Sequence, residues 1–193
     1  MQEQKIVFLD RDGTINVYKN YLYLIKEFEF IPGSIEGLKL LQDAGFILVV
    51  VTNQSGIGRG KYSEEDFLIL DSWMKKKLAE NGVDIWKTYY CPHLPGAPIK
   101  KYDRECSCRK PQTGLFFNAI KELSEYGEVN IERCYAIGDK MRDLTICNEQ
   151  DIQGFLIDTD LKLSEGNIEI VDSLLSAAIK IIEKEKAFLG EMG

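Results

Sequence analysis

Two aspartates stand two positions apart near the start of the chain, directly after a short apolar run. The run Lys5–Leu9 (KIVFL) is followed by Asp10-Arg11-Asp12-Gly13-Thr14, in which the glycine allows a sharp turn. Side chains at i and i+2 of an extended segment point to the same side, and two like charges there need a cation or a shared proton. Mg2+ would serve, since it favours hard oxygen ligands. The alternative is an Asx turn that ends a strand, with Asp12 bonded to backbone amides.

Polar residues also follow a second apolar run, residues 46–51 (FILVVV). A hydroxyl at the end of such a strand can donate a hydrogen bond to a phosphoryl oxygen, which makes Thr52 a candidate for that role; a plain polar turn is the alternative. Three glycines between positions 56 and 60 predict a flexible loop, into which Arg59 and Lys61 bring positive charge.

Cations and further carboxylates occur later in the chain. Arg109 and Lys110 (CRKP) offer a planar fork and a fixed ammonium, which suit a transferring phosphoryl group, although a surface Lys–Arg pair is usually only solvated. The stretch GDKMRD follows another apolar run. Within it, Asp139 could complete a Mg2+ site and Asp143 could support it from nearby. A capped turn that leads into a helix is the alternative.

Residue types that bind soft metals cluster between positions 91 and 108. Cys91-Pro92-His93 and Cys106-Ser107-Cys108 combine three thiols with the only histidine of the chain. Three thiolates and one imidazole suit tetrahedral Zn2+, and four protein ligands leave no open position, so we expect a structural metal. Buried cysteines beside a surface histidine are the alternative. A loop held by zinc would fix Arg109 and Lys110, which follow Cys108 directly.

Composition limits the classes of function. The 193 residues are 45% hydrophobic and carry a net charge of −7, which predicts one globular domain over residues 1–193 and argues against nucleic-acid binding by bulk charge. No apolar run approaches the ~18 residues of a membrane-spanning helix. The first five residues lack the basic and apolar regions of a signal peptide. We therefore expect a cytoplasmic protein without a membrane partner.

Apolar, β-rich runs alternate with helical patterns along the chain. Strands are expected at residues 5–9, 46–51, 86–90, 134–137 and 155–157. Helices are expected at 34–44, after the capping pattern at Ser63, at 114–126 and at 168–188, with an irregular segment at 91–111. The alternation predicts an α/β fold, a Rossmann-like parallel sheet with helices on both faces. In such a fold the site lies beyond the carboxyl ends of the strands.

The motifs together resemble those of the haloacid dehalogenase superfamily of phosphotransferases. FLDRDGT is similar to its first motif, and Thr52, Lys110 and GDKMRD follow in the order of the other three. With the Cys/His cluster, the chain resembles the D-glycero-D-manno-heptose-1,7-bisphosphate phosphatases and the related histidinol-phosphate phosphatases. The shared stretches, which lie within residues 6–144, are FLDRDGTIN, FEFIPG, VVVTNQSGIGRGK, YYCPH, CSCRKP and GDKMRDL.

The resemblance implies a mechanism and a set of residue roles. Asp10 would be the nucleophile that forms an aspartyl phosphate, and Asp12 the general acid and base. Mg2+ would be held by the Asp10 carboxylate, the Asp12 backbone carbonyl and Asp139. Three residues would stabilise the transferring phosphoryl group, namely Thr52, Arg109 and Lys110. Lys140 would bind the substrate.

Selection of the substrate would fall to loops, because the stretch between Asp12 and Thr52 leaves little room for a cap domain beside its expected helix. We therefore expect a capless enzyme. The candidate selecting segments are residues 18–21, residues 53–61 and the zinc loop, which adds Lys100, Lys101 and Arg104. The individual candidates in the first two segments are Tyr18, Lys19, Asn20, Tyr21, Asn53, Gln54, Ser55 and Arg59.

Several functions compete. The leading hypothesis is hydrolysis of the C7 phosphate of a heptose bisphosphate, in the synthesis of nucleotide-activated heptose for bacterial surface glycans (lipopolysaccharide). Histidinol-phosphate phosphatase shares the motifs and the zinc loop and stays open. A polynucleotide 3′-phosphatase is disfavoured by the acidic composition and by the lack of a basic stripe with interleaved aromatics. A zinc-stabilised interaction module would leave the carboxylates without a shared purpose. A compact enzyme of this kind is expected to be a monomer.

Overall fold

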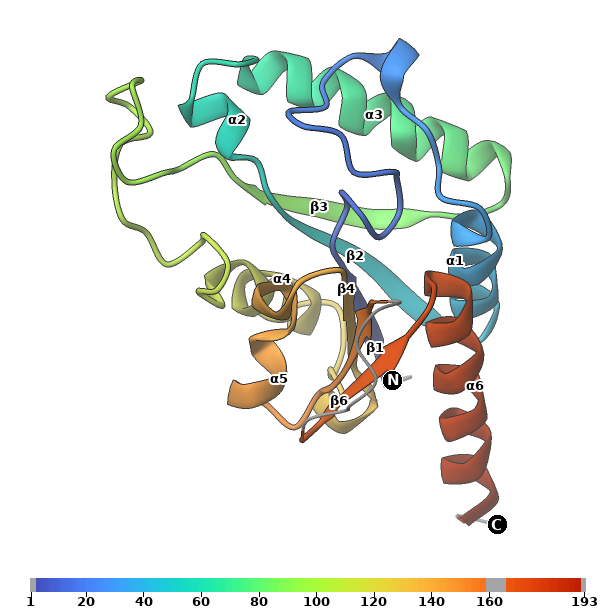
Figure 1. Cartoon of the computed structure of the whole chain (residues 1–193). Helices are drawn as coiled ribbons and strands as arrows, with labels where there is room; N and C mark the ends of the chain where they lie inside the picture. Colours follow the sequence, from blue (N-terminus) through green and yellow to red (C-terminus); the bar gives the residue numbers. More distant parts are fainter. Residues whose placement is uncertain (1–2, 159–165, 192–193) are drawn as a thin grey trace.

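The apolar runs of the sequence form one six-stranded sheet, in which every pair of neighbouring strands is parallel (Figure 1). The computed structural model describes residues 3–158 and 166–191. The sheet order is β3-β2-β1-β4-β5-β6. The strands are β1 (Lys5–Leu9), β2 (Phe46–Asn53), β3 (Ile85–Cys91), β4 (Tyr135–Gly138), β5 (Gln153–Ile157) and β6 (Ile168–Val171).

Strand β1 lies at the centre of the sheet, between β2 and β4. Its residue Leu9 is in register with Val50 on one side and with Ile137 on the other. The backbone N–H of Asp10 continues this ladder by donating to the Ile137 carbonyl at 3.0 Å. The segments that follow β1, β2 and β4 therefore meet at one edge of the sheet, as the parallel arrangement predicts.

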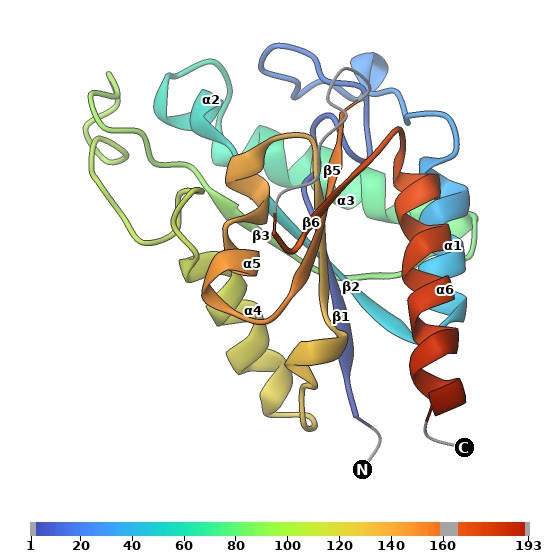
Figure 2. The ribbon, with the colours of Figure 1, turned by 60° about the horizontal axis from the view of Figure 1, so that its bottom comes forward.

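Helices cover both faces of the sheet, as predicted (Figure 2). One face is covered by α1 (Ser34–Asp43), α3 (Glu64–Glu80) and α6 (Leu174–Glu191), and the other by α4 (Gly114–Ser124) and α5 (Ile146–Glu149). Short segments complete the chain: η1 (Ile25–Glu27), α2 (Ser55–Gly58), η2 (Ile131–Arg133) and η3 (Met141–Leu144). None of the helices in the described ranges is both long and apolar enough to cross a bilayer.

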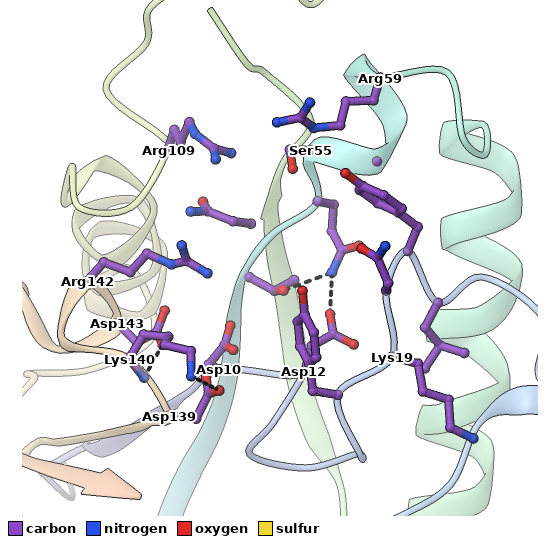
Figure 3. Close-up of a pocket in the computed structure, with 18 of the residues that line it drawn as sticks. Asp10, Asp12, Lys19, Ser55, Arg59, Arg109, Asp139, Lys140, Arg142 and Asp143 are labelled. Carbon is purple, nitrogen blue, oxygen red and sulfur yellow. Dashed lines mark hydrogen bonds and ion pairs between the residues drawn. The ribbon is translucent and has the colours of Figure 1, made fainter. Parts of the chain in front are cut away.

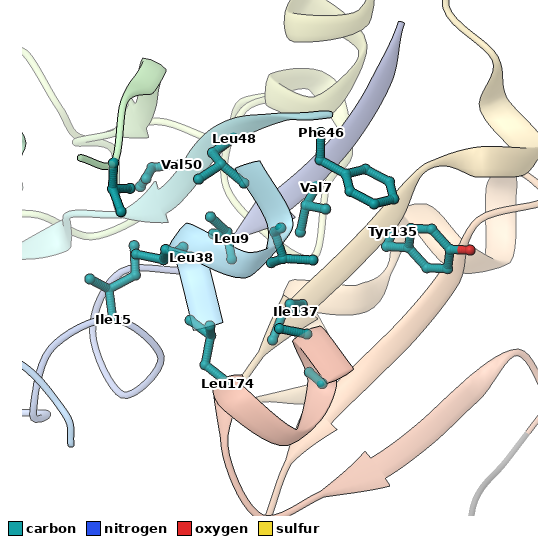
Figure 4. Close-up of a cluster of buried hydrophobic side chains, with 14 of the residues drawn as sticks. Val7, Leu9, Ile15, Leu38, Phe46, Leu48, Val50, Tyr135, Ile137 and Leu174 are labelled. Atoms are coloured by element: carbon teal, nitrogen blue, oxygen red, sulfur yellow. The ribbon is translucent and has the colours of Figure 1, made fainter. Parts of the chain in front are cut away.

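The core is built from alternating side chains of the central strands. Val7 and Leu9 point into the cluster under α1 and α6 (Figure 4), whereas Ile6 and Phe8 point into the cluster under α4. All four side chains are fully buried, which explains why β1 reads as a continuous apolar run rather than an alternating one.

Two expectations about secondary structure are wrong. The helix expected at 168–188 begins only at Leu174, because residues 168–171 (IEIV) pair with β5 as an extra edge strand. Ser173 then starts the helix by accepting from the Ser176 N–H at 3.1 Å, as an N-cap hydroxyl does. The glycine-rich segment after Thr52 is not a loop throughout: residues 55–58 form helix α2, and a Cβ on Gly56 would lie 2.2 Å from the Tyr62 ring.

Helix α6 is tied to the sheet through one buried carboxylate, Glu185. Its Oε2 accepts from Lys5 Nζ at 2.9 Å and from Arg133 Nη2 at 2.6 Å. Burial pushes the pKa of Glu185 upward, but the bonds from Arg133 and Lys5 outweigh it, and the pKa is lowered overall. A carboxylate with a lowered pKa contributes stability above its unfolded pKa and loses that contribution as the pH falls through its folded pKa.

We expect Glu185→Gln to lower the free energy of unfolding by about 2 kcal/mol at pH 7, because it leaves two partly buried cations without their counter-ion. The difference from the parent should shrink below about pH 4.5, where the unfolded carboxyl becomes protonated. Urea unfolding at several pH values measures it. A difference that stays constant from pH 7 to pH 3 would contradict the ionic role.

Candidate active site

A cavity of about 280 Å³ opens at the carboxyl ends of β1, β2 and β4 (Figure 3). Aspartates lie at its floor and arginines at its rim. Most of the residues that the sequence marked as catalytic or substrate-binding line it. The exception is Lys110, whose side chain is buried beneath the floor against Asp10. The lining includes Asp10, Asp12, Tyr18, Lys19, Asn20, Tyr21, Thr52, Asn53, Gln54, Ser55, Arg59, Arg109, Asp139, Lys140, Arg142 and Asp143.

Lys110 is the buried cation of the site. Its Nζ lies 2.7 Å from Asp10 Oδ1, 2.7 Å from Asp143 Oδ1 and 2.6 Å from the Val51 carbonyl oxygen. Burial alone would lower the pKa of Lys110, but Asp10 and Asp143 outweigh it and raise the pKa. The ammonium is therefore held charged under the candidate nucleophile.

Burial raises the pKa of the Asp10 carboxyl to about 7, and the nearby charges of Asp143 and Asp12 add to the rise while Lys110 opposes it. An aspartate in this setting gains most from a cation that keeps it ionised. Lys110 supplies one such positive charge, directly beneath the candidate nucleophile.

Three carboxylates form a group that suits a hard divalent cation. Asp10, Asp139 and Asp143 offer ligand oxygens within 4.8 Å of one another. Gly13 makes room for this group, because its φ is +91° and a Cβ there would lie 2.4 Å from Asp139 Oδ2. Burial raises the pKa of Asp139, against the lowering by Lys140 at 3.0 Å. These residues fit Mg2+. Asp143 lies beside Asp10 and Asp139, the two carboxylates predicted to bind the ion.

The Asp12 carboxylate lies outside that group and accepts hydrogen bonds from three residues. Arg11 Nη2 lies 2.9 Å from both of its oxygens, Asn16 Nδ2 lies 3.0 Å from Oδ1, and Gln54 Nε2 lies 3.0 Å from Oδ2. The side chain of Asp12 is 18% exposed and lines the cavity. It is thus open to substrate while its position is fixed from behind.

The polar residues that follow β2 line the cavity, and several of them also bond to other residues of the protein. Thr52 is buried, and its Oγ1 accepts from Gln54 Nε2 at 2.9 Å. Asn53 clamps the segment that carries Lys110: Asn53 Nδ2 donates to the Lys110 carbonyl at 2.9 Å, and the Lys110 N–H donates to Asn53 Oδ1 at 3.0 Å. The substrate contacts predicted for Asn53 and Gln54 stay predictions, and the structure gives both side chains internal partners.

Arginines surround the outer part of the cavity. Arg59, Arg109 and Arg142 all line it. Burial lowers the pKa of Arg109, and the charges of Arg142 and Arg59 lower it further, so both lie within electrostatic reach of Arg109. Guanidinium groups gathered in this way suit an anion. Arg142 is a site residue that sequence patterns do not single out, although it lies three residues after Asp139 within GDKMRD.

The segment at residues 18–21 lines the opposite rim of the cavity, and its part in substrate selection stays a prediction. Tyr18 is 63% exposed, and Tyr21 adopts a positive φ of 59°. Lys19 turns away from the aspartates (Figure 3), and its Nζ donates to the Glu27 carbonyl and pairs with Glu29 at 3.5 Å. Its role in substrate binding stays a prediction, and its charge is already paired within the chain.

The Cys/His cluster assembles as a four-ligand group beside the cavity. Sulfur–sulfur distances among Cys91, Cys106 and Cys108 are 3.1–3.6 Å, and His93 Nδ1 lies 3.2 Å from Cys108 Sγ. Tetrahedral Zn2+ with bonds of about 2.3 Å separates its sulfur ligands by about 3.8 Å, so the four side chains fit zinc. Arg109 Nη1 donates to the His93 carbonyl at 3.3 Å, which connects the cluster to the arginine rim.

We expect Cys106→Ser to lower zinc content from one equivalent per chain to a small fraction, because one of four ligands is lost. Thermal stability should fall, and affinity for inorganic phosphate should weaken, since the cluster positions Arg109. Metal analysis, thermal melts and phosphate binding measure the three effects. Cys134→Ser is the matched control: Cys134 is buried at the start of β4 and belongs to the core. Normal zinc content in Cys106→Ser would contradict the ligand assignment.

Comparison with known proteins gives consistent matches. The family model described as polynucleotide kinase 3 phosphatase matches residues 5–170. A D-glycero-beta-D-manno-heptose-1,7-bisphosphate 7-phosphatase from Haemophilus ducreyi is 39% identical over 181 residues, which cover 93% of this chain and 97% of that protein. The enzyme of the same name from Photorhabdus laumondii is 49% identical over 138 residues, 72% of this chain and 71% of that one.

Solved structures agree with these relatives. The D,D-heptose 1,7-bisphosphate phosphatase from B. bronchiseptica, complexed with magnesium and phosphate, superposes with a TM-score of 0.79 at 26% identity and covers 94% of this chain and 99% of that one. A HAD-like phosphatase from Mesorhizobium loti gives a TM-score of 0.82 at 28% identity, over 94% of this chain and 87% of that one. The resemblance to the haloacid dehalogenase superfamily is thereby confirmed.

Proposed function

Because the chain belongs to the D,D-heptose 1,7-bisphosphate phosphatase family of the haloacid dehalogenase superfamily, we propose that it hydrolyses the C7 phosphate of D-glycero-D-manno-heptose 1,7-bisphosphate. The single observation that carries the proposal is the pairing of an aspartate floor with a rim of arginines in one cavity. The floor provides a nucleophile and an acid, and the rim provides the charge that a second phosphate needs.

In the first step an oxygen of the Asp10 carboxylate attacks phosphorus, and the bond from phosphorus to the C7 oxygen breaks. Asp12 gives its proton to that oxygen as the sugar leaves, and Asp10 becomes an aspartyl phosphate. Lys110 and the hydroxyl of Thr52 stabilise the charge of the transferring group. Lys110 is already in place, 2.7 Å from Asp10.

In the second step Asp12, now a carboxylate, takes a proton from water while the water oxygen attacks phosphorus. The bond from phosphorus to Asp10 breaks, inorganic phosphate leaves, and Asp12 is again protonated. Mg2+ bound by Asp10, Asp139 and the Asp12 carbonyl would supply the positive charge that lets an anionic nucleophile meet a phosphate dianion. Zn2+ in the Cys/His cluster would be structural.

The charge pattern of the cavity favours a heptose bisphosphate over histidinol phosphate as the substrate. Every carboxylate that lines it belongs to the reactive end, namely Asp10, Asp12, Asp139 and Asp143. The outer part presents Arg59, Arg109 and Arg142 instead. The amino group and imidazole of histidinol phosphate would meet cations there, whereas the second phosphate of a heptose bisphosphate would be attracted. This pattern supports the sugar substrate for an enzyme whose net charge is −7.

We also propose that the enzyme is a cytoplasmic monomer. Every residue that the mechanism uses belongs to this one chain, so the reaction needs no residue from a second subunit. Three thiol ligands that are not joined by disulfides are typical of a reducing compartment, which supports the cytoplasm. A polynucleotide substrate has the acidic composition of the chain against it.

The test is phosphate release measured side by side on the heptose bisphosphate and on histidinol phosphate, with 31P NMR to identify which phosphate remains on the sugar. We expect a higher kcat/KM on the bisphosphate and a product that keeps its C1 phosphate. A higher kcat/KM on histidinol phosphate would overturn the proposal. Arg59→Ala should raise KM for the bisphosphate more than for histidinol phosphate.

A further inference from the structure

A chain of hydrogen bonds leads from a buried tyrosine to the acid–base aspartate. Tyr62 Oη lies 2.5 Å from Gln54 Oε1, and Gln54 Nε2 bridges Asp12 Oδ2 at 3.0 Å and Thr52 Oγ1 at 2.9 Å. Tyr62 and Gln54 are both buried, at 8% and 2% exposure. Tyr62 has no role in the mechanism given above.

The orientation of the Gln54 amide follows from the chemistry of its three partners. A carboxylate only accepts hydrogen bonds, so the amide nitrogen must face Asp12, and its oxygen then faces Tyr62. Burial raises the pKa of the Tyr62 phenol, so its hydroxyl keeps the proton that it donates to this oxygen. The same orientation makes Thr52 Oγ1 an acceptor from Gln54, which leaves the Thr52 hydrogen free to point at a phosphoryl oxygen.

Two packing contacts hold the Tyr62 ring in place. Its ring stacks on Tyr23 with centroids 5.5 Å apart and an interplanar angle of 15°. The ring also lies against Gly56, where a Cβ would be 2.2 Å from Tyr62 Cε1. The absence of a side chain at Gly56 thus allows the phenol to reach Gln54, and both ring contacts limit its movement.

We propose that Tyr62 is a positioning residue, which acts through the Gln54 amide to hold the Asp12 carboxyl group where it transfers its proton to the leaving oxygen. The inference rests on the proposed function, in which Asp12 is the general acid. Without the phenol hydroxyl, the Gln54 oxygen loses its buried donor, and the amide is free to rotate away from Asp12.

The test compares Tyr62→Phe with the parent on two kinds of phosphate ester. The heptose bisphosphate expels a poor alkoxide leaving group that needs the proton of Asp12, whereas p-nitrophenyl phosphate expels a phenolate that leaves without one. We expect kcat/KM on the sugar to fall by about 10-fold, below the ~10²–10⁴ that a whole general acid contributes. On p-nitrophenyl phosphate the fall should be under about threefold.

Controls separate positioning from general damage. Tyr89→Phe removes a hydroxyl bonded to Glu122 at 2.7 Å, away from the cavity, and should leave both reactions unchanged. In a Gln54→Met background, Tyr62→Phe should cause no further loss on the sugar, because the amide through which Tyr62 acts is gone. Thermal melts of all variants show whether they are folded.

Equal losses on the two esters, no loss on the sugar, or a full further loss in the Gln54→Met background would each overturn the inference. An equal loss would point to Thr52, which contacts the phosphoryl group that both substrates share. If the parent hydrolyses other alkyl phosphates but not the heptose bisphosphate, the proposed substrate is wrong, and the role of Tyr62 is still open to the same test. The best alkyl phosphate then replaces the sugar in the same comparison with p-nitrophenyl phosphate.

Discussion

An Asp10→Asn variant should fold and release no measurable phosphate, with a loss of roughly 10⁴-fold or more. The substituted amide cannot attack phosphorus, and no other carboxylate stands at the end of β1 with Lys110 at 2.7 Å. Stability should change little, because the substitution removes one charge from a group of three crowded carboxylates and leaves Lys110 paired with Asp143 at 2.7 Å. Steady-state phosphate release and thermal melting measure the two effects.

The matched control is Asp84→Asn, an exposed aspartate at the other end of the sheet, just before β3. It should retain full activity. Beryllofluoride should form its adduct on Asp10 in the parent and form none in Asp10→Asn. Residual turnover above about one part in a thousand, or an adduct on another residue, would show that Asp10 is not the nucleophile.

The second large effect is expected from Lys110→Met, which keeps most of the side-chain volume and removes the buried charge. Asp10 and Asp143 would then face each other without a cation, and breaking a buried ion pair in this way costs about 3–5 kcal/mol. The rate should fall by about 10²-fold or more, since the transferring group loses a fixed donor.

The pH dependence of the Lys110→Met protein has a definite sign. Burial already raises the pKa of Asp10 to about 7, and the loss of Lys110 removes the main opposing effect. A carboxyl whose pKa is raised by folding contributes stability at low pH and loses it as the pH rises through the folded value. The metal-free variant should therefore unfold at lower urea concentration at pH 8 than at pH 5.

Lys121→Met, on the exposed side of α4, is the control for the loss of a lysine. It should leave the rate unchanged and alter the free energy of unfolding by no more than ~0.5 kcal/mol. A Lys110→Met protein as stable as the parent at pH 8 would mean that the aspartates have another source of compensation.

The sequence predicts the sheet and the floor of the site because both follow from local signals. Strands β1 and β2 are continuous apolar runs, and each is followed by the polar residues that the structure places in the cavity. Parallel strands bring such residues together whatever the details of the loops. The capping box at Ser63 is also confirmed, with reciprocal bonds to Asp66.

Pairing with distant residues is what the sequence does not reveal. Residues 168–171 have apolar positions that suit a helix, and only their partnership with β5 makes them a strand. Asn53 and Gln54 look like substrate contacts because they follow Thr52, yet their partners are Lys110 and Tyr62. Arg142 gains its significance only when Arg109 is placed near it across the cavity.

The clamp between Asn53 and the Lys110 backbone has a consequence for how such enzymes diversify. Cys91 and His93 hold one end of the loop and Cys106 and Cys108 the other, while Asn53 anchors its last turn independently. The ammonium beneath the nucleophile is therefore anchored apart from the exposed positions of the loop, such as Lys100 and Glu105, which can be exchanged without shifting it. Tyr102 is different, because it packs in one buried cluster with Tyr62 and ties the loop to α2 and α3. New specificities can evolve, or be grafted by an engineer, at the exposed positions of this rim.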